Sequence, residues 1–371
     1  MNNNLPWWFH TLALPAVNIL LALTACAVVL LVIDVNIVEA ARIMFIGALG
    51  NQEGIGYTLF YATNFMFTGL AVALAWHAGL FNIGAEGQAT LGGLGVAMIC
   101  ATFGDSLPFG LLVILTTLSA AFFGALWAFI PGWLNAYRGS HIVISTIMFN
   151  FIASSLLVFL LVNVFRQPDQ MAAVSQTFGE QTWLPYLDQL FKFVGGEISR
   201  TPLNISFLWA VFCCFLVHYY LFHTRFGYET RGIGFNHRAG AFAGIDKSRV
   251  IIVTMALAGA LAGFVGLNEI QGSSHQLKVE FVAGYGFAGI AVALIGRNHP
   301  LGIIAASILF GALYQGGSEL AFNIDRIGND IVLLIQGLVI LFCGALEWMV
   351  KPKLIALFSG SPKQPVGDSR G

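Results

Sequence analysis

Ten stretches of this chain, each of 16 or more residues, contain no Asp, Glu, Lys or Arg. A helix needs about 20 mostly apolar residues to cross a hydrocarbon layer roughly 30 Å thick. Charged residues make up only 9% of the 371 residues, far fewer than the surface of a soluble protein carries. We therefore predict an all-α polytopic membrane protein with about ten transmembrane helices, some of them broken. The charge-free stretches are 1–33, 54–85, 87–104, 106–137, 139–165, 201–224, 250–268, 281–296, 298–318 and 331–346.

Basic residues are divided unevenly between the two sides of such a protein. If ten spans alternate, 11 of the 17 Lys and Arg fall on the side that holds both termini, and the positive-inside rule places that side in the cytoplasm. Residues 1–350 are then expected to form one transmembrane domain, followed by a cytoplasmic tail, 351–371. The long extracytoplasmic loop 166–200 either folds as a small cap or a short surface helix, or is a solvated connection.

Composition and missing motifs exclude several classes of function. A net charge of −1 gives no attraction to polyanions, so no nucleic-acid partner is expected. The chain contains no HExxH or GxSxG motif, and none of its lysines follows a glycine, which excludes a GxxxxGK[ST] phosphate loop. Its five cysteines lie in apolar stretches without CxxC spacing and are expected to pack as small apolar residues. We expect no catalytic residue, no metal and no cofactor.

The segment from Trp76 to Gly95 is polar and glycine-rich in a region that is otherwise apolar. Glu86 is the only charged residue from 54 to 104, with Asn82 and Gln88 close by. A carboxylate at the centre of a membrane costs about 2.5 to 3.5 kcal/mol, so these side chains are not expected to face lipid. Glu86 either caps backbone N–H groups at its own helix start or faces a polar path for a solute.

A second glycine-rich stretch, 281–296, contains Gly284, Gly286 and Gly289. Short interrupted helices of this kind mark the midplane of transporters. Close packing of helices through small residues is the alternative explanation. Our leading hypothesis assigns a translocation path to Asn82, Glu86, Gln88, Gly284, Gly286 and Gly289.

The run Gly79-Leu80-Phe81-Asn82-Ile83-Gly84-Ala85-Glu86-Gly87-Gln88 resembles a signature of the ABC-importer permeases of the branched-chain amino acid, ribose and nucleoside superfamily. Within that superfamily the chain is most similar to simple-sugar and nucleoside permeases. The inner loop from Thr224 to Asn236, with Ala243-Gly244-Ile245, resembles the cytoplasmic coupling segment of the same family. The family usually has Asn-Pro and two alanines where this chain has Asn236-His237-Arg238-Ala239-Gly240.

The resemblance implies a permease subunit of the bacterial inner membrane, without an ATPase site of its own. Its partners would be cytoplasmic ATP-binding-cassette ATPases, a second permease that is a copy or a similar chain, an extracytoplasmic solute-binding protein and the lipid bilayer. Nucleosides or simple sugars would be imported by alternating access. The loop 223–249 would couple the chain to the ATPases through Arg225, Gly227, Arg231, Gly234, Asn236 and Gly244.

Two other classes of function remain as alternatives. An ion-coupled secondary transporter would use Glu86 to carry a proton or sodium ion, because Glu269 and Glu319 are expected near helix ends. A membrane enzyme would require clustered His, Cys or paired acidic residues at membrane depth, and the sequence offers none.

Overall fold

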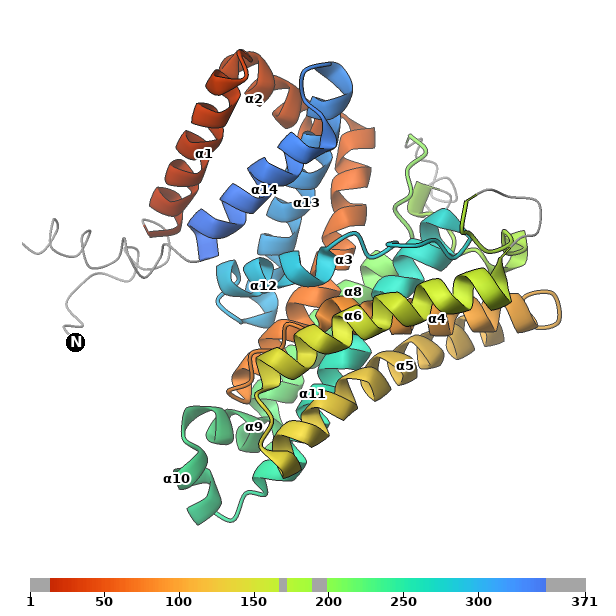
Figure 1. Ribbon diagram of the computed structural model, residues 1–371, viewed down its shortest axis with the longest axis vertical. Coiled ribbons are helices and arrows are strands. Elements are labelled where there is room, and N and C mark those ends of the chain that lie inside the picture. The colour runs from red at the N-terminus through yellow and green to blue at the C-terminus, as the bar shows by residue number, and fades with distance from the viewer. Residues whose placement is uncertain (1–13, 167–171, 189–198, 345–371) are drawn as a thin grey trace, which may run out of the picture. The chain divides into compact units, whose positions relative to one another are not determined.

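The computed structural model describes residues 14–166, 172–188 and 199–344, and within them it is built from helices (Figure 1). The chain forms two compact units, Arg42–Leu320 on its own and Met1–Ala41 together with Ala321–Gly371. The described α-helices are α1 (Leu14–Val32), α2 (Ile37–Phe45), α3 (Gln52–His77), α4 (Ala85–Phe103), α5 (Phe109–Arg138), α6 (Ile142–Leu160), α8 (Ser206–His223), α9 (Arg225–Phe235), α10 (His237–Phe242), α11 (Lys247–Gly263), α12 (Tyr285–Ile295), α13 (Pro300–Asn323) and α14 (Asn329–Gly344).

Each charge-free stretch of the sequence contains one of these helices. In the described part of the chain, six helical segments are long and apolar enough to cross a membrane: Gln52–His77, Phe109–Arg138, Ile142–Phe165, Ser206–His223, Lys247–Ser274 and Pro300–Asn323. The chain is therefore a helical, multi-pass membrane protein. The count of ten spans and the cytoplasmic placement of both termini stay predictions.

Helix α3 forms the core of the larger unit. Every residue from Ala62 to Ala75 is buried, because α3 packs against α8, α11 and α12. A helix that is apolar all round is stable when other helices surround it. The glycine-rich α12 is only 11 residues long, about half of what a full crossing needs.

Helices α4, α5 and α11 approach one another through small residues. A side chain at Gly259 of α11 would overlap the carbonyl oxygen of Gly124 in α5, and one at Gly263 would overlap that of Ala120. A side chain at Gly92 of α4 would likewise overlap the backbone of Gly263. Helices in a membrane associate through such close backbone packing.

We expect Gly259→Ala to lower the thermal stability of the purified protein. The added methyl group overlaps backbone on α5, so the helices must separate, which costs roughly 1–3 kcal/mol. Gly110→Ala is the matched control, because a side chain there meets nothing within 4 Å. Equal melting temperatures for the two variants in detergent would contradict the close packing.

The described part of the loop 166–200 folds as a cap on the segment that follows α11. Ser175 N–H donates to the carbonyl of Leu277 over 3.0 Å, and Phe178 N–H donates to that of His275 over 2.8 Å. The His275 ring stacks on Trp183 with centroids 3.8 Å apart, and its Nε2 lies 2.8 Å from the Tyr186 hydroxyl. This part of the loop is thus a folded cap rather than a solvated connection.

His275 gives the cap a predicted dependence on pH. Burial lowers the pKa of His275 to about 4, whereas an unfolded histidine titrates near about pH 6.5. Between these values the unfolded chain binds more protons than the native one, so stability is full above about pH 6.5 and declines towards pH 4. We expect the melting temperature to fall over that range. His275→Asn, a residue type that tolerates the φ of 52° at this position, should flatten the fall; equal slopes would argue against the assignment.

Helices α9 and α10 lie at the opposite end of the larger unit from the cap (Figure 1). Thr224 caps α9 by accepting the N–H of Gly227 over 3.0 Å, and Asn236 caps α10 by accepting that of Arg238 over 2.9 Å. Asp246 caps α11 in the same way through the N–H of Ser248. The predicted coupling loop 223–249 therefore contains two short helices, each started by a polar cap, and it ends at the capped start of α11.

In the smaller unit, α1 packs against α14. Arg326 forms an ion pair with Asp34 at 3.1 Å. The proposed tail 351–371 lies outside the described residues, and a single domain over residues 1–350 stays a prediction. Cysteines 26, 100, 213 and 214 are buried and not disulfide-bonded, while the side chain of the fifth, at position 343, is not described.

Candidate functional site

The first glycine-rich segment is a break between two helices. Helix α3 ends at His77, Gly79 follows with a left-handed φ of 75°, and α4 begins at Ala85. The amides of Asn82 and Gln88 donate to one another, each over 3.1 Å, and both side chains are buried. Asn82 also accepts the N–H of Gly84 over 2.9 Å. The hydrogen bonds of Asn82 and Gln88 therefore stabilise the backbone conformation of the break.

A side chain of helix α6 also forms hydrogen bonds with the backbone at this break. The Asn150 side chain accepts the N–H of Gly87 over 2.9 Å and donates to the carbonyl of Ile83 over 2.9 Å. The Gly87 N–H lies in the first turn of α4, where a helix leaves its N–H groups without partners, and the Ile83 carbonyl lies in the break itself. One amide on α6 thus bonds to the backbone of the break and of the start of α4, and no sequence pattern indicated this.

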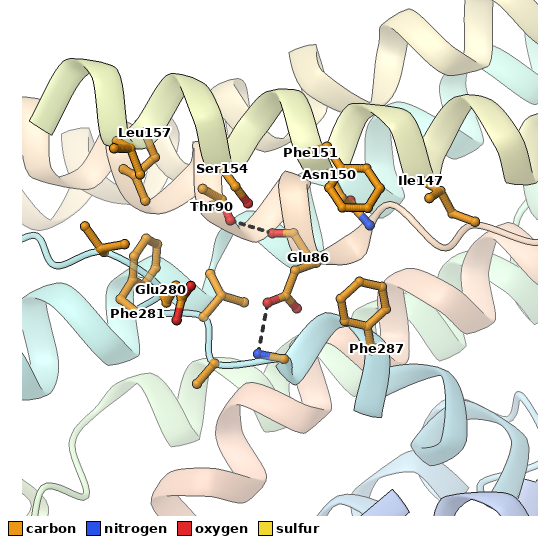
Figure 2. Close-up of a pocket in the computed structure, with 15 residues that line it drawn as sticks. Glu86, Thr90, Ile147, Asn150, Phe151, Ser154, Leu157, Glu280, Phe281 and Phe287 are labelled. Carbon is orange, nitrogen blue, oxygen red and sulfur yellow. Dashed lines mark hydrogen bonds between the residues drawn. The ribbon is translucent and has the colours of Figure 1, made fainter. Parts of the chain in front are cut away.

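Glu86 joins the first glycine-rich segment to the second. Its Oε1 accepts the N–H of Gly284 over 2.9 Å (Figure 2). Its Oε2 accepts the N–H of Gly286 over 2.8 Å. These N–H groups open α12, where the helix dipole favours negative charge. Glu86 is therefore a helix cap, but for α12 rather than for its own helix.

The three glycines predicted in the second segment have three different roles. Gly284 has a φ of 81° and open space around it, so its conformation is what requires glycine. A side chain at Gly286 would overlap the backbone of Glu86, and one at Gly289 would lie against Thr68 of α3. Gly284 and Gly286 thus contact Glu86, whereas Gly289 packs α12 on α3.

A cavity of about 350 Å³ lies beside this junction. Its walls come from the start of α4, from α6 and from residues 279–287 (Figure 2). Glu86, Asn150, Ser154 and Glu280 supply polar groups, and Phe151, Phe281 and Phe287 supply aromatic rings. The volume is in the range of small-molecule sites. Of the predicted path residues, Glu86 and Gly284 line this cavity, and Asn82, Gln88, Gly286 and Gly289 do not.

Residues 280–284 reach α12 through strained backbone. Glu280 and Ala283 have left-handed φ values of 57° and 49°. A non-glycine residue pays roughly 1–2 kcal/mol for this conformation. Such strain persists where the surroundings fix it, and it concentrates at binding and switching sites.

The residues assigned to ATPase coupling mostly make contacts within the chain. Gly227 packs against the backbone of Tyr220 and Leu221, and the Arg231 guanidinium lies 5.1 Å from the centre of the Phe222 ring. Gly244 has a left-handed φ of 76° just beyond α10. Arg225 is exposed and pairs with Glu229 at 3.1 Å, and Asn236 caps α10.

Gly234 connects this segment to the first helix break. A side chain at Gly234 would overlap the carbonyl oxygen of His77, at the end of α3, and lie against the N–H of Gly79. The Nε2 of His77 in turn donates to the carbonyl of Asn298, just after α12, over 2.9 Å. Helix α9 is therefore packed on the turn that links α3 to α4, and that turn is bonded to the far end of α12.

Sequence reasoning missed two further features. Asn64 Nδ2 donates to Glu269 over 2.6 Å, and Asn268 donates to Asn64 Oδ1 over 2.9 Å, which forms a polar network beside α3. Glu269 lies inside a π-helical continuation of α11, Leu267–Ser274, that the charge pattern did not reveal. Phe235 and Phe242, at the ends of α9 and α10, are 95% and 94% exposed. The position of Phe235 and Phe242 in an otherwise polar loop could have indicated them in the sequence.

Comparison with known proteins places this geometry in a family. The chain is 33% identical over 361 residues to the glucose ABC transporter permease protein of Haloferax volcanii, covering 96% of this chain and 93% of that one. It is 32% identical over 335 residues to the guanosine ABC transporter permease protein of Bacillus subtilis, covering 89% and 92%. It is 30% identical over 360 residues to a nucleoside ABC transporter permease protein of Lactococcus lactis subsp. cremoris, covering 95% and 97%.

No solved structure matches the chain. Residues 54–344 match the family described as the branched-chain amino acid transport system / permease component. This range contains both helix breaks, the Glu86 cap and the α9–α10 segment. By this match, and by its similarity to permeases over nearly its whole length, the chain belongs to that family of ABC transporter permeases.

Proposed function

We propose that this chain is the membrane permease of an ATP-driven importer for nucleosides or simple sugars. It would take solute from an extracytoplasmic binding protein and release it to the cytoplasm by alternating access across the cytoplasmic membrane. Relatives that carry glucose, guanosine and nucleoside permease names support this solute class. ATP would be hydrolysed by partner ATPases.

The observation that carries the proposal is the contact of α9 with the first helix break. A force on α9 reaches the turn at His77 and Gly79 through Gly234, and it reaches the end of α12 through Asn298. Glu86 connects the start of α12 to the start of α4. The break between α3 and α4 and the short helix α12 are therefore both linked to α9, a segment that ATPases could move, as alternating access requires.

The same contacts weigh against ion coupling through Glu86. Both of its oxygens accept backbone N–H groups, so the carboxylate already has the partners that a coupled ion would replace. The dipole of α12 stabilises a negative charge at its start, so a charged residue at this position does not require a transported ion.

The exposed rings of Phe235 and Phe242 support docking of the ATPase on this segment. Both lie at the end of the larger unit opposite the cap. Exposed aromatic side chains are enriched among residues that anchor protein interfaces.

We expect the double variant Phe235→Ala, Phe242→Ala to weaken co-purification of the ATPase at least tenfold. Tyr137→Ala, which removes another exposed ring from the end of α5, should leave the complex intact.

The proposed function is tested by reconstitution. The chain with its ATPase, any second permease and the binding protein should take up radiolabelled guanosine or glucose into liposomes when ATP is supplied to the ATPase. Uptake that needs only a proton or sodium gradient, and proceeds without ATPase, would overturn the proposal.

A further inference from the structure

The cavity beside Glu86 carries acidic charge only. Among the fifteen described residues that line it, Glu86 and Glu280 are charged and no Lys, Arg or His is present. The Glu86 carboxylate is held by the N–H groups of α12. Glu280 is exposed, and within the described residues its carboxylate has no hydrogen bond or ion pair. Glu280 is thus an acceptor available to a ligand.

Apolar surface accompanies this acceptor. The rings of Phe151 and Phe287 lie beside Glu86, and Ser154 places a hydroxyl on the wall that α6 forms (Figure 2). Aromatic rings pack well against a planar base or the apolar face of a sugar ring. A carboxylate accepts strong hydrogen bonds from hydroxyl groups and repels anions.

From this lining we infer that the cavity receives an uncharged, hydroxyl-rich solute, and that Glu280 selects it by accepting hydroxyl hydrogen bonds and rejecting anions. The inference rests on the proposed function and narrows it. A phosphorylated sugar, a nucleotide or the carboxylate of an amino acid finds no cation in the lining and meets two carboxylates. A nucleoside or sugar brings donors for Glu280 and a face for Phe151 and Phe287.

A cysteine placed in the cavity measures its charge directly, without the binding protein. Ser154→Cys puts an exposed thiol on the wall, while the described native cysteines are buried. In the full-length chain assembled with its ATPase, a cationic methanethiosulfonate should label this thiol about tenfold faster than an anionic one of similar size. The wild-type chain corrects for labelling of native cysteines. Adding Glu280→Gln should bring the two rates within about threefold. Equal rates with Glu280 present would overturn the inference.

Protection from labelling tests the solute class. Millimolar guanosine or glucose should slow the labelling of Ser154→Cys, whereas guanosine 5′-monophosphate and glucose 6-phosphate should not. Equal protection by the phosphorylated compounds, or protection by none of the four, would overturn the inference. If Ser154→Cys does not assemble, Val158→Cys gives a second exposed position in the same lining.

Two controls separate this inference from the proposed function. Glu53→Gln removes an exposed acid of the larger unit that does not line the cavity, and it should leave the rate ratio unchanged. ATP-driven uptake by the unmodified chain is measured separately. Absence of uptake alongside charge-selective, solute-protected labelling would reject the ATP-driven importer only. Uptake alongside unselective labelling would reject the role of Glu280 only.

Discussion

Replacing Glu86 with glutamine is expected to reduce ATP-driven uptake at least tenfold and to lower the melting temperature. The glutamine amide keeps one acceptor oxygen, but its NH2 group then faces the N–H of Gly284 or Gly286. One buried N–H at the start of α12 loses its partner, which costs roughly 1–3 kcal/mol. The loss of charge removes the interaction with the α12 dipole as well.

The length of the side chain can be separated from its charge. Glu86→Asp keeps the carboxylate but is one methylene shorter, so it cannot reach both N–H groups, and we expect intermediate uptake. Glu53→Gln is the matched control, because Glu53 is an exposed acid at the start of α3. Thermal unfolding in detergent and uptake in liposomes are measured for all three. Wild-type behaviour of Glu86→Gln in both assays would show that the cap is dispensable.

The helices could be predicted from the sequence because charge and length decide where a chain can cross lipid. Each charge-free stretch contains a helix, and each loop with clustered charge separates two of them. The π-helical continuation of α11 was missed, because Glu269 and Asn268 end the apolar run although the backbone continues as a helix. The hydrogen bond from Asn64 allows Glu269 to be buried within this helix. No local sequence pattern predicts a partner 205 positions away.

The site was predicted in parts and not as a whole. Scarce charge singled out Glu86, and clustered glycines singled out 284–289, but their meeting depends on packing between segments about 200 residues apart. The sequence left Glu86 either as a cap of its own helix or as a solute ligand. The structure shows a third arrangement, in which it caps α12. Among the coupling residues, Gly234 was found through the family pattern, yet its contact with His77 could come only from the fold.

The second large effect is expected from adding a single methyl group at Gly234. In Gly234→Ala the new Cβ overlaps the carbonyl oxygen of His77, so α9 or the turn after α3 must shift. Overlap with backbone costs roughly 1–3 kcal/mol, since backbone cannot rotate away as a flexible side chain can. The shift falls where α9 packs against the helix break. We expect ATP hydrolysis to continue while uptake falls at least tenfold.

A control on the same helix makes this result specific. In Gly232→Ala the new Cβ meets only the end of the Ile245 side chain, at an ordinary 3.4 Å, so hydrolysis and uptake should both be retained. Both variants add the same helix-favouring methyl group, so a difference between them cannot come from helix propensity. ATPase activity and uptake are measured on the same liposomes, and binding of the ATPase is checked by co-purification. Because the ATPase would still bind and hydrolyse ATP, loss of uptake in Gly234→Ala alone would place the fault between α9 and the helix break. Equal uptake by both variants would mean that motion reaches the broken helices by another route.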